Sequence, residues 1–250
     1  MATTRQGLVS HIREISILLG GYFTYMFVRK VIVPGADAIG LENARELISF
    51  EKVVGVFWEP TLQDWGAKAG RRVLVFFNYL YIVTFVPVVL TTAVVLYIKN
   101  RERYLYYRGI VLLSFAAALL VFAIFPLAPP RFVSLSGLAD TIAVHGPLWY
   151  AGRELAVYYN AFAAMPSLHF SWALLIGFMF WRSGPWLLKP AAVIYPAATL
   201  LAIIITGNHY VMDAVVGALM MLIIYELYEH MLGRGVTLRF WRNPPKKSEP

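Results

Sequence analysis

The stretch VLVFFNYLYIVTFVPVVLTTAVVLYI, residues 73–98, decides the fold class of this chain because it contains no charged residue. A helix needs about 20 mostly apolar residues to cross the hydrocarbon core of a bilayer. Residues 109–130, 155–181 and 190–212 also lack Asp, Glu, Lys and Arg, and residues 190–212 contain one histidine, His209. These four segments therefore predict four membrane-spanning helices.

Two further segments extend the prediction to about six spans. Residues 209–229 are apolar apart from Asp213 near the start and two glutamates near the end, and residues 15–33 end in two basic residues that can snorkel to the surface. Hydrophobic residues make up 59% of the chain and charged residues 14%, against about 25% in a soluble domain. We expect an all-α polytopic membrane helical bundle, with residues 1–250 forming a single integral-membrane domain. Residues 15–33 could alternatively be the apolar core of a cleaved signal peptide.

The basic residues predict how the bundle is oriented. Placing both termini in the cytoplasm collects most of the 22 Lys and Arg residues on that side, as the positive-inside rule requires. The segments assigned to the cytoplasm are 1–14, 99–108, 182–189 and the tail 230–250. The net charge of +8 then reflects topology and anionic lipid headgroups, and we expect no nucleic-acid partner. We expect a plasma membrane as the location of the protein, and the family resemblance given below implies a bacterial one.

Residues 38–65, between the first two predicted spans, have the pattern of an amphipathic helix. Apolar residues recur at roughly helical spacing with charged residues between them, and Trp58 lies at the apolar edge. Such a helix lies in the membrane interface, as an anchor or as a lid over a lipid site. The apolar positions are Leu41, Ala44, Ile48, Val54, Phe57 and Trp58.

Polar residues from distant parts of the chain converge at the outer face of this predicted bundle. Arg131 follows the third span, Ser167 and His169 lie near the outer mouth of the fourth, and His209 and Asp213 open the sixth. Asn78 and Tyr81, inside residues 73–98, are instead predicted to make hydrogen bonds between helices. An aspartate within a span is costly and usually has a partner and a function. This convergence predicts one polar site that faces away from the cytoplasm.

The residue types in this site suit phosphoryl transfer. His209 and Asp213 are four residues apart, so a helix places them on one face. A carboxylate held against an imidazole fixes the tautomer of the ring, which can then act as a nucleophile or base. His169 could protonate a leaving group, while Ser167 and Arg131 could hold an anion. Phosphoryl transfer requires mainly such positioning and charge stabilisation.

Two motifs resemble those of the type-2 phosphatidic acid phosphatase superfamily over residues 72–229. AMPSLH resembles its P-S-x-H motif, and TGNHYVMD resembles the His and Asp of its last motif, S-R-x5-H-x3-D. The combination of APPR, MPSLH and GNHYxxDAVVG is most similar to the inositol phosphorylceramide synthase branch and its bacterial relatives. The resemblance implies that His209 attacks phosphorus and forms a phosphohistidine, that Asp213 orients it, that His169 donates a proton and that Ser167 binds phosphate.

The chain departs from the superfamily pattern at its cations. It contains no Arg-Pro dipeptide, and Ile203 occupies the place of the arginine expected six residues before His209. We expect Arg131 to replace the missing cation, with Arg72 and Asn208 as further phosphate-binding residues. This departure favours a phosphotransferase-like enzyme, and it leaves open whether water or an alcohol is the acceptor.

Two other classes of function fit some of the same residues. Two imidazoles and a carboxylate are suitable zinc ligands, so a metal-dependent membrane hydrolase is one alternative. A proton-coupled transporter is another, since intramembrane His and Asp also carry protons. The chain has no cysteine and no H-E-x-x-H motif, and its polar groups lie at one surface without an internal repeat. We therefore expect a lipid phosphate as substrate, membrane lipids as surroundings, and neither a metal nor a cofactor.

Overall fold

The computed structural model describes residues 9, 11–21, 23–24, 27, 36–147 and 162–231. Every regular element among these residues is helical, and one isolated parallel bridge joins Leu127 to Ala163. The prediction of an all-α fold is therefore confirmed. Residues 22, 25–26 and 28–33 of the predicted first span, 15–33, and residues 232–250 of the tail, 230–250, lie outside the described residues, whereas residues 11–21 are helical.

Four helices in the described part of the chain are long and apolar enough to cross a membrane. They cover Arg71–Lys99, Arg101–Ile124, Trp186–Ile205 and Val211–Met231. These correspond to four of the predicted spans. The first consists of α4 (Arg71–Tyr79), the π-helical turn η1 (Leu80–Thr84) and α5 (Phe85–Lys99). The second is α6 (Arg101–Ile124). The third consists of η4 (Trp186–Leu188) and α10 (Lys189–Ile205), and the fourth is α11 (Val211–Met231).

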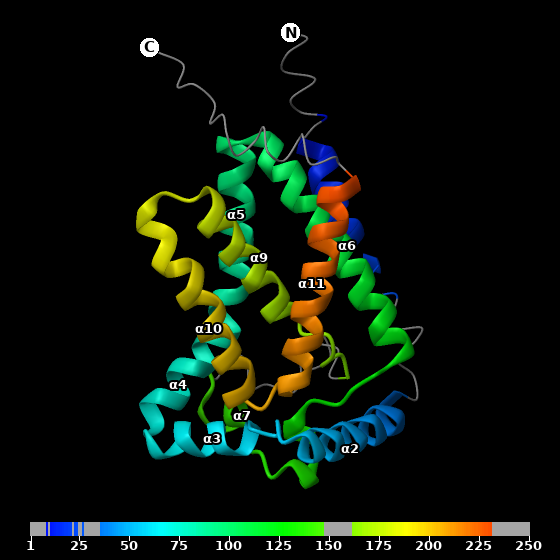
Figure 1. Ribbon diagram of the computed structural model, residues 1–250, viewed down its shortest axis with the longest axis vertical. Coiled ribbons are helices and arrows are strands. Elements are labelled where there is room, and N and C mark those ends of the chain that lie inside the picture. The colour runs from blue at the N-terminus through cyan, green and yellow to red at the C-terminus, as the bar shows by residue number, and fades with distance from the viewer. Residues whose placement is uncertain are drawn as a thin grey trace.

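The segment predicted to span as residues 155–181 differs from its prediction. Its helix, α9 (Leu168–Ser183), begins only after Pro166 and has 16 residues. At 1.5 Å per residue it is about 24 Å long, shorter than the ~30 Å hydrocarbon core. Residues 155–161 of the predicted span lie outside the described residues. Residues 162–167 are not helical because their backbone pairs elsewhere: Leu127 N donates to Phe162 O (2.9 Å) and Ala164 N donates to Leu127 O (3.2 Å). Figure 1 shows α9 beginning further inside the bundle than the neighbouring ends of α10 and α11.

The predicted interfacial helix 38–65 is two helices. α2 (Ala36–Val54) ends before Gly55, whose φ of 76° is readily adopted only by glycine, and α3 (Glu59–Lys68) restarts with Pro60 in its first turn. Together with α7 (Thr141–His145) they lie across one end of the bundle (Figure 1). Of the apolar positions, Ala44 and Ile48 are buried in a core cluster with Leu127 and Tyr210, whereas Trp58 is 54% exposed.

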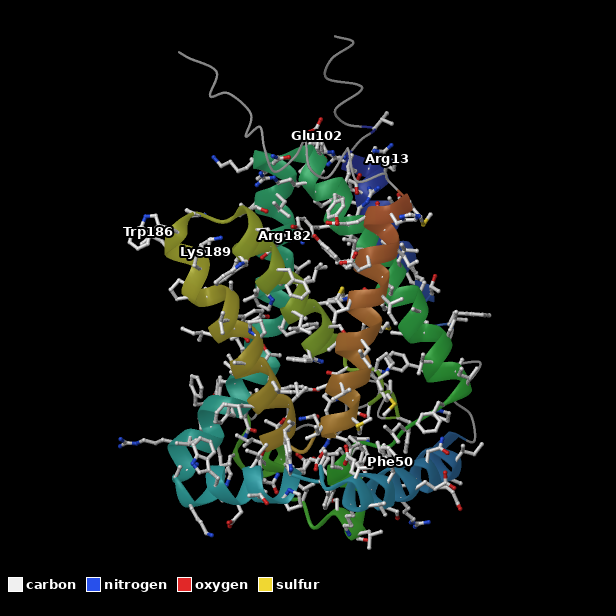
Figure 2. All side chains as sticks on the ribbon, viewed as in Figure 1. Arg13, Phe50, Glu102, Arg182, Trp186 and Lys189 are labelled. Carbon is white, nitrogen blue, oxygen red and sulfur yellow. The ribbon has the colours of Figure 1, made fainter. Side chains whose placement is uncertain are left out.

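The opposite end of the bundle holds the described parts of the segments predicted to be cytoplasmic. Figure 2 shows Arg13, Glu102 and Arg182 at that end and Phe50 of α2 at the other. Buried Glu14 there accepts hydrogen bonds from Arg101 (2.9 Å), Arg108 (2.7 Å) and Tyr104 (2.9 Å), so its charge is well compensated. These contacts tie the helical residues 11–21 to α6.

A close contact between α9 and α11 sets the spacing of the site. The carbonyl oxygen of Ser167 lies so near Gly217 that a Cβ atom at this glycine would be 2.7 Å from it. The Ser171 hydroxyl lies 2.7 Å from Ser167 O and 2.8 Å from Gly217 O, and these carbonyls accept its hydrogen bond. The start of α9 is therefore held directly against the first turns of α11.

Candidate active site

His209 sits in a tight turn between α10 and α11. Gly207, with φ of 70°, reverses the chain after α10, and the backbone N–H groups of Asn208 and His209 both donate to Ile203 O at 3.1 Å. The Nδ1 atom of His209 then lies 2.8 Å from Ala164 O and 3.2 Å from Asp213 Oδ2. The predicted His209–Asp213 pair is thus in contact, and a carbonyl from the loop before α9 joins it.

These partners fix the tautomer of His209. Both neighbours of Nδ1 are oxygen acceptors, so we assign the ring proton to Nδ1. The Nε2 atom is then left with its lone pair, which is the form of imidazole that acts as a nucleophile. Asp213 is fully buried, and its Oδ2 also accepts a hydrogen bond from Tyr210 N at 2.9 Å, which holds the carboxylate in place.

His169 comes from the first turn of α9 and faces the same site. Its ring centroid is 5.9 Å from that of His209, with the planes tilted by 57°. Tyr81 stacks on His169 at 4.6 Å between centroids and Phe85 packs against it at 4.0 Å. Both aromatic residues lie at the π-helical turn η1, an irregularity that often occurs at functional sites. The contact of Tyr81 with His169 was not predicted from the sequence. Asn78 forms the predicted hydrogen bonds between helices, with Thr141 as its partner.

Arg131 and Asn208 are brought together beside the His209 turn. Arg131 lies in η2 (Pro130–Phe132), and its guanidinium donates to Asn208 Oδ1. Its Nε atom is 3.4 Å from Asp140 Oδ2, and its backbone N–H donates to Gly207 O at 3.1 Å. The guanidinium of Arg131 thus lies next to the residue that precedes His209.

Ser167 and Arg72 differ in how they relate to the site. Ser167 is fully buried at the N-terminus of α9, where its Oγ accepts from Phe170 N (3.4 Å) and its N–H donates to Asp213 O (3.1 Å). It therefore joins the two motifs through the backbone. Arg72 is exposed at the start of α4, in an open hollow with Arg71 and Phe76. Among the described residues, no recorded contact joins Arg72 to the histidines.

Glu51 and Glu59 are structurally important residues that the sequence reasoning missed. Both are fully buried, and they accept hydrogen bonds from consecutive N–H groups at the start of α11. Val211 N donates to Glu59 Oε1 (2.6 Å) and Met212 N donates to Glu51 Oε1 (2.9 Å). Helical spacing from Ile48 places Glu51 on the buried face of α2, and this signal could have revealed it.

Burial changes the acidity of this pair. Desolvation, followed by repulsion from Glu59, raises the pKa of Glu51 from its usual 4.5 to about 9. Desolvation likewise raises the pKa of Glu59. At neutral pH the Glu51–Glu59 pair therefore retains a proton.

Comparison with known families identifies the chain. The sequence profile of the PAP2 superfamily matches residues 45–227, a segment that includes His169, His209 and Asp213. The chain belongs to the PAP2 superfamily, whose members are generally phosphatases and phosphotransferases. No curated protein and no solved structure matches this chain. Superfamily membership and the apolar helices together fit a membrane enzyme of phosphate chemistry.

Proposed function

We propose that this protein is a lipid-phosphate phosphotransferase or phosphatase that works through a phosphohistidine on His209. The observation that carries the proposal is the pair of acceptors on Nδ1, Asp213 Oδ2 at 3.2 Å and Ala164 O at 2.8 Å. They leave Nε2 unprotonated beside a second imidazole. The superfamily match supports the same reaction class.

The proposed first step transfers the phosphoryl group to the enzyme. The lone pair of His209 Nε2 attacks phosphorus, and the bond to the leaving oxygen breaks with its electron pair remaining on that oxygen. His169, in its protonated form, gives this oxygen a proton. Asp213 stabilises the positive charge that develops on the His209 ring.

The second step releases the phosphoryl group. His169, now neutral, takes a proton from water or an alcohol, and the oxygen of that acceptor attacks phosphorus. The phosphorus–nitrogen bond breaks and its electron pair returns to Nε2, which restores the starting state. The absence of the Arg-Pro dipeptide and the presence of Ile203 support the branch similar to inositol phosphorylceramide synthases, in which the acceptor is an alcohol.

The proposed site faces away from the cytoplasm. Its residues lie at the end of the bundle covered by α2 and α3, whereas the basic segments that are typical of cytoplasmic loops lie at the other end (Figures 1 and 2). The substrate is then a lipid phosphate of the outer leaflet of the bacterial plasma membrane.

The test is to trap the phosphoenzyme. Purified protein is incubated with ³²P-labelled short-chain lipid phosphates, quenched in alkali, and digested to locate the label. We expect alkali-stable label on His209, no label in His209→Asn, and normal label in His230→Ala, a control at the exposed far end of α11. Absence of label and of lipid turnover in the folded wild-type protein would refute the proposal and favour transport.

A chelator separates this mechanism from the metal-dependent alternative. Among the described residues no group of three or more His, Cys, Asp or Glu side chains is arranged to hold a metal ion. We expect turnover to persist in EDTA. Turnover that is lost in EDTA and restored by a divalent metal would favour a metal-dependent hydrolase.

A further inference from the structure

Three consecutive backbone N–H groups at the start of α11 are each bound by a different carboxyl group. Tyr210 N donates to Asp213 Oδ2 (2.9 Å), Val211 N to Glu59 Oε1 (2.6 Å) and Met212 N to Glu51 Oε1 (2.9 Å). The first N–H groups of a helix have no partner within the helix, so outside acceptors decide where the helix starts. Here two of the three acceptors come from α2 and α3.

The environment of the second carboxyl oxygen of each glutamate indicates that this buried site holds a proton. Glu51 Oε2 and Glu59 Oε2 are buried and have no hydrogen-bond partner among the described residues. Two adjacent carboxylates in one buried site cannot both ionise without strong repulsion. The titratable groups that face the pair are Asp213 of α11 and Tyr210 just before it, and Asp213 adds further negative charge. A single proton on the pair relieves this repulsion while leaving both Oε1 atoms as acceptors.

We propose that Glu51 and Glu59 are positioning residues for the nucleophile: they hold the first turn of α11, and with it the contact between Asp213 and His209. The same turn carries Asp213, whose Oδ2 binds both Tyr210 N and His209 Nδ1. If the N–H groups of Val211 and Met212 lose their acceptors, the turn loosens and the carboxylate shifts against the imidazole. This inference rests on the proposed function for its effect on turnover, but the geometry of His209 can be measured without turnover.

The proposal gives helices α2 and α3 a role in catalysis in addition to anchoring the protein in the membrane interface. α2 and α3 lie across the bundle end, and their buried carboxyl groups are the direct link from that layer to the nucleophile (Figure 1). The negative charge that remains on the Glu51–Glu59 pair is favoured at a helix N-terminus by the helix dipole.

The test uses two truncations, one conservative variant and a matched control. Glu51→Ala and Glu59→Ala each remove one acceptor, Glu51→Gln keeps the acceptor without an ionisable proton, and Glu46→Ala removes an exposed acid from the same helix as Glu51. We expect both truncations to lower kcat about tenfold or more while KM changes less than twofold, as for a displaced nucleophile. We expect Glu51→Gln and Glu46→Ala to match the wild type at pH 7. Wild-type kcat in both folded truncations would overturn the proposal.

A pH profile decides the case if the truncations do not fold. The pKa of Glu51, about 9 in the folded protein against its usual 4.5, means that the side chain carries its proton below pH 9 and loses it above. The second negative charge then repels Glu59 and Asp213, so kcat of the wild type should fall above pH 9, and Glu51→Gln should lack this component of the fall. An unchanged alkaline limb in Glu51→Gln would overturn the proposal.

A third measurement separates failure of this proposal from failure of the proposed function. ¹⁵N spectra of histidine-labelled protein in bilayers report the tautomer of His209, assigned through His209→Asn. We expect the Nδ1–H tautomer in every variant, because the Ala164 carbonyl holds the ring proton. The Nδ1 chemical shift should be the same in the wild type and in Glu46→Ala, and it should change in Glu59→Ala, where Asp213 moves relative to the ring. If no variant turns over a lipid phosphate, this shift still supports positioning, and its absence in a folded Glu59→Ala protein refutes positioning.

Discussion

The change Asp213→Asn tests how much the negative charge of Asp213 contributes to catalysis, because asparagine has nearly the same shape as aspartate. The carboxylate oxygen Oδ2 accepts hydrogen bonds from His209 Nδ1 (3.2 Å) and Tyr210 N (2.9 Å), and the amide oxygen of asparagine can accept both. The Ala164 carbonyl, 2.8 Å from Nδ1, continues to hold the ring proton. The variant therefore keeps the His209 tautomer and loses only the negative charge.

The size of the expected loss follows from the distance. A unit charge 3.2 Å from the Nδ1 atom contributes about 5 kcal/mol at an effective dielectric constant of about 20. The amide dipole of asparagine and the Ala164 carbonyl retain part of this stabilisation, so we expect kcat to fall about 10³-fold. A triad in which the same change also flips the imidazole tautomer loses about 10⁴-fold, and the Ala164 contact should keep this protein below that value.

The assay is single-turnover formation of the phosphoenzyme, followed by steady-state release of product from a short-chain lipid phosphate in detergent. Glu226→Gln removes an exposed acid from the same helix and should leave both rates unchanged. The Asp213→Asn protein should keep a thermal unfolding midpoint close to that of the wild type, because the change removes a buried charge. A rate within threefold of the wild type would show that the carboxylate does not stabilise the reacting imidazole.

Three further predictions follow from contacts around the site. Gly217→Ala places a Cβ atom 2.7 Å from a carbonyl oxygen that precedes α9, so overpacking should destabilise the protein by about 1–3 kcal/mol in thermal unfolding and lower turnover. Arg131→Ala should weaken competitive inhibition by vanadate about tenfold, because a charge-assisted anion contact is lost. Phe85→Ala frees the ring of His169, whose centroid is 4.0 Å away, and should slow substrates with poor leaving groups more than aryl phosphates, which need no proton donor.

Each of these predictions has a result that contradicts it. Gly20→Ala is the control for added helix propensity, because a Cβ atom at Gly20 would meet no other atom within 4 Å. If Gly217→Ala and Gly20→Ala had the same unfolding midpoint and turnover, close packing of α9 on α11 would be contradicted. Unchanged vanadate inhibition in Arg131→Ala would remove this arginine from the phosphate site. If Phe85→Ala slowed all substrates equally, the contact of Phe85 with His169 would not be needed for proton donation to the leaving group.

The contact of His209 with Asp213 and the proximity of His169 could be predicted from the sequence because two simple regularities fix them. Charge-free stretches define where spans end, so residues at those ends share a depth in the bundle. Helical periodicity then places residues four apart on one face. Neither regularity depends on how the side chains of other helices pack, and the described structure brings the three residues together.

The start of α9 and the roles of Glu51 and Glu59 could not be predicted in this way, because both depend on burial by protein. The apolar residues before Pro166 resemble the beginning of a span, but a backbone pairing with the segment after α6 holds them out of a helix. Helical spacing can place Glu51 on the apolar face of its helix, but it does not identify the groups that its carboxyl oxygens bind. Only the placement of α11 against α2 and α3 shows that the carboxyl groups of Glu51 and Glu59 accept hydrogen bonds from the first N–H groups of α11.

Ile203 shows how the chain accommodates its departure from the superfamily motif. Its side chain is fully buried in the hydrophobic core with Ala214, so this position cannot supply a cation to the site. Its carbonyl oxygen accepts the N–H groups of both Asn208 and His209, so its backbone still shapes the turn that presents the nucleophile. The guanidinium of Arg131 reaches the same turn from η2 through Asn208. We therefore propose that the positive charge for phosphate comes from the loop after α6, while the residue six positions before His209 keeps a purely structural role.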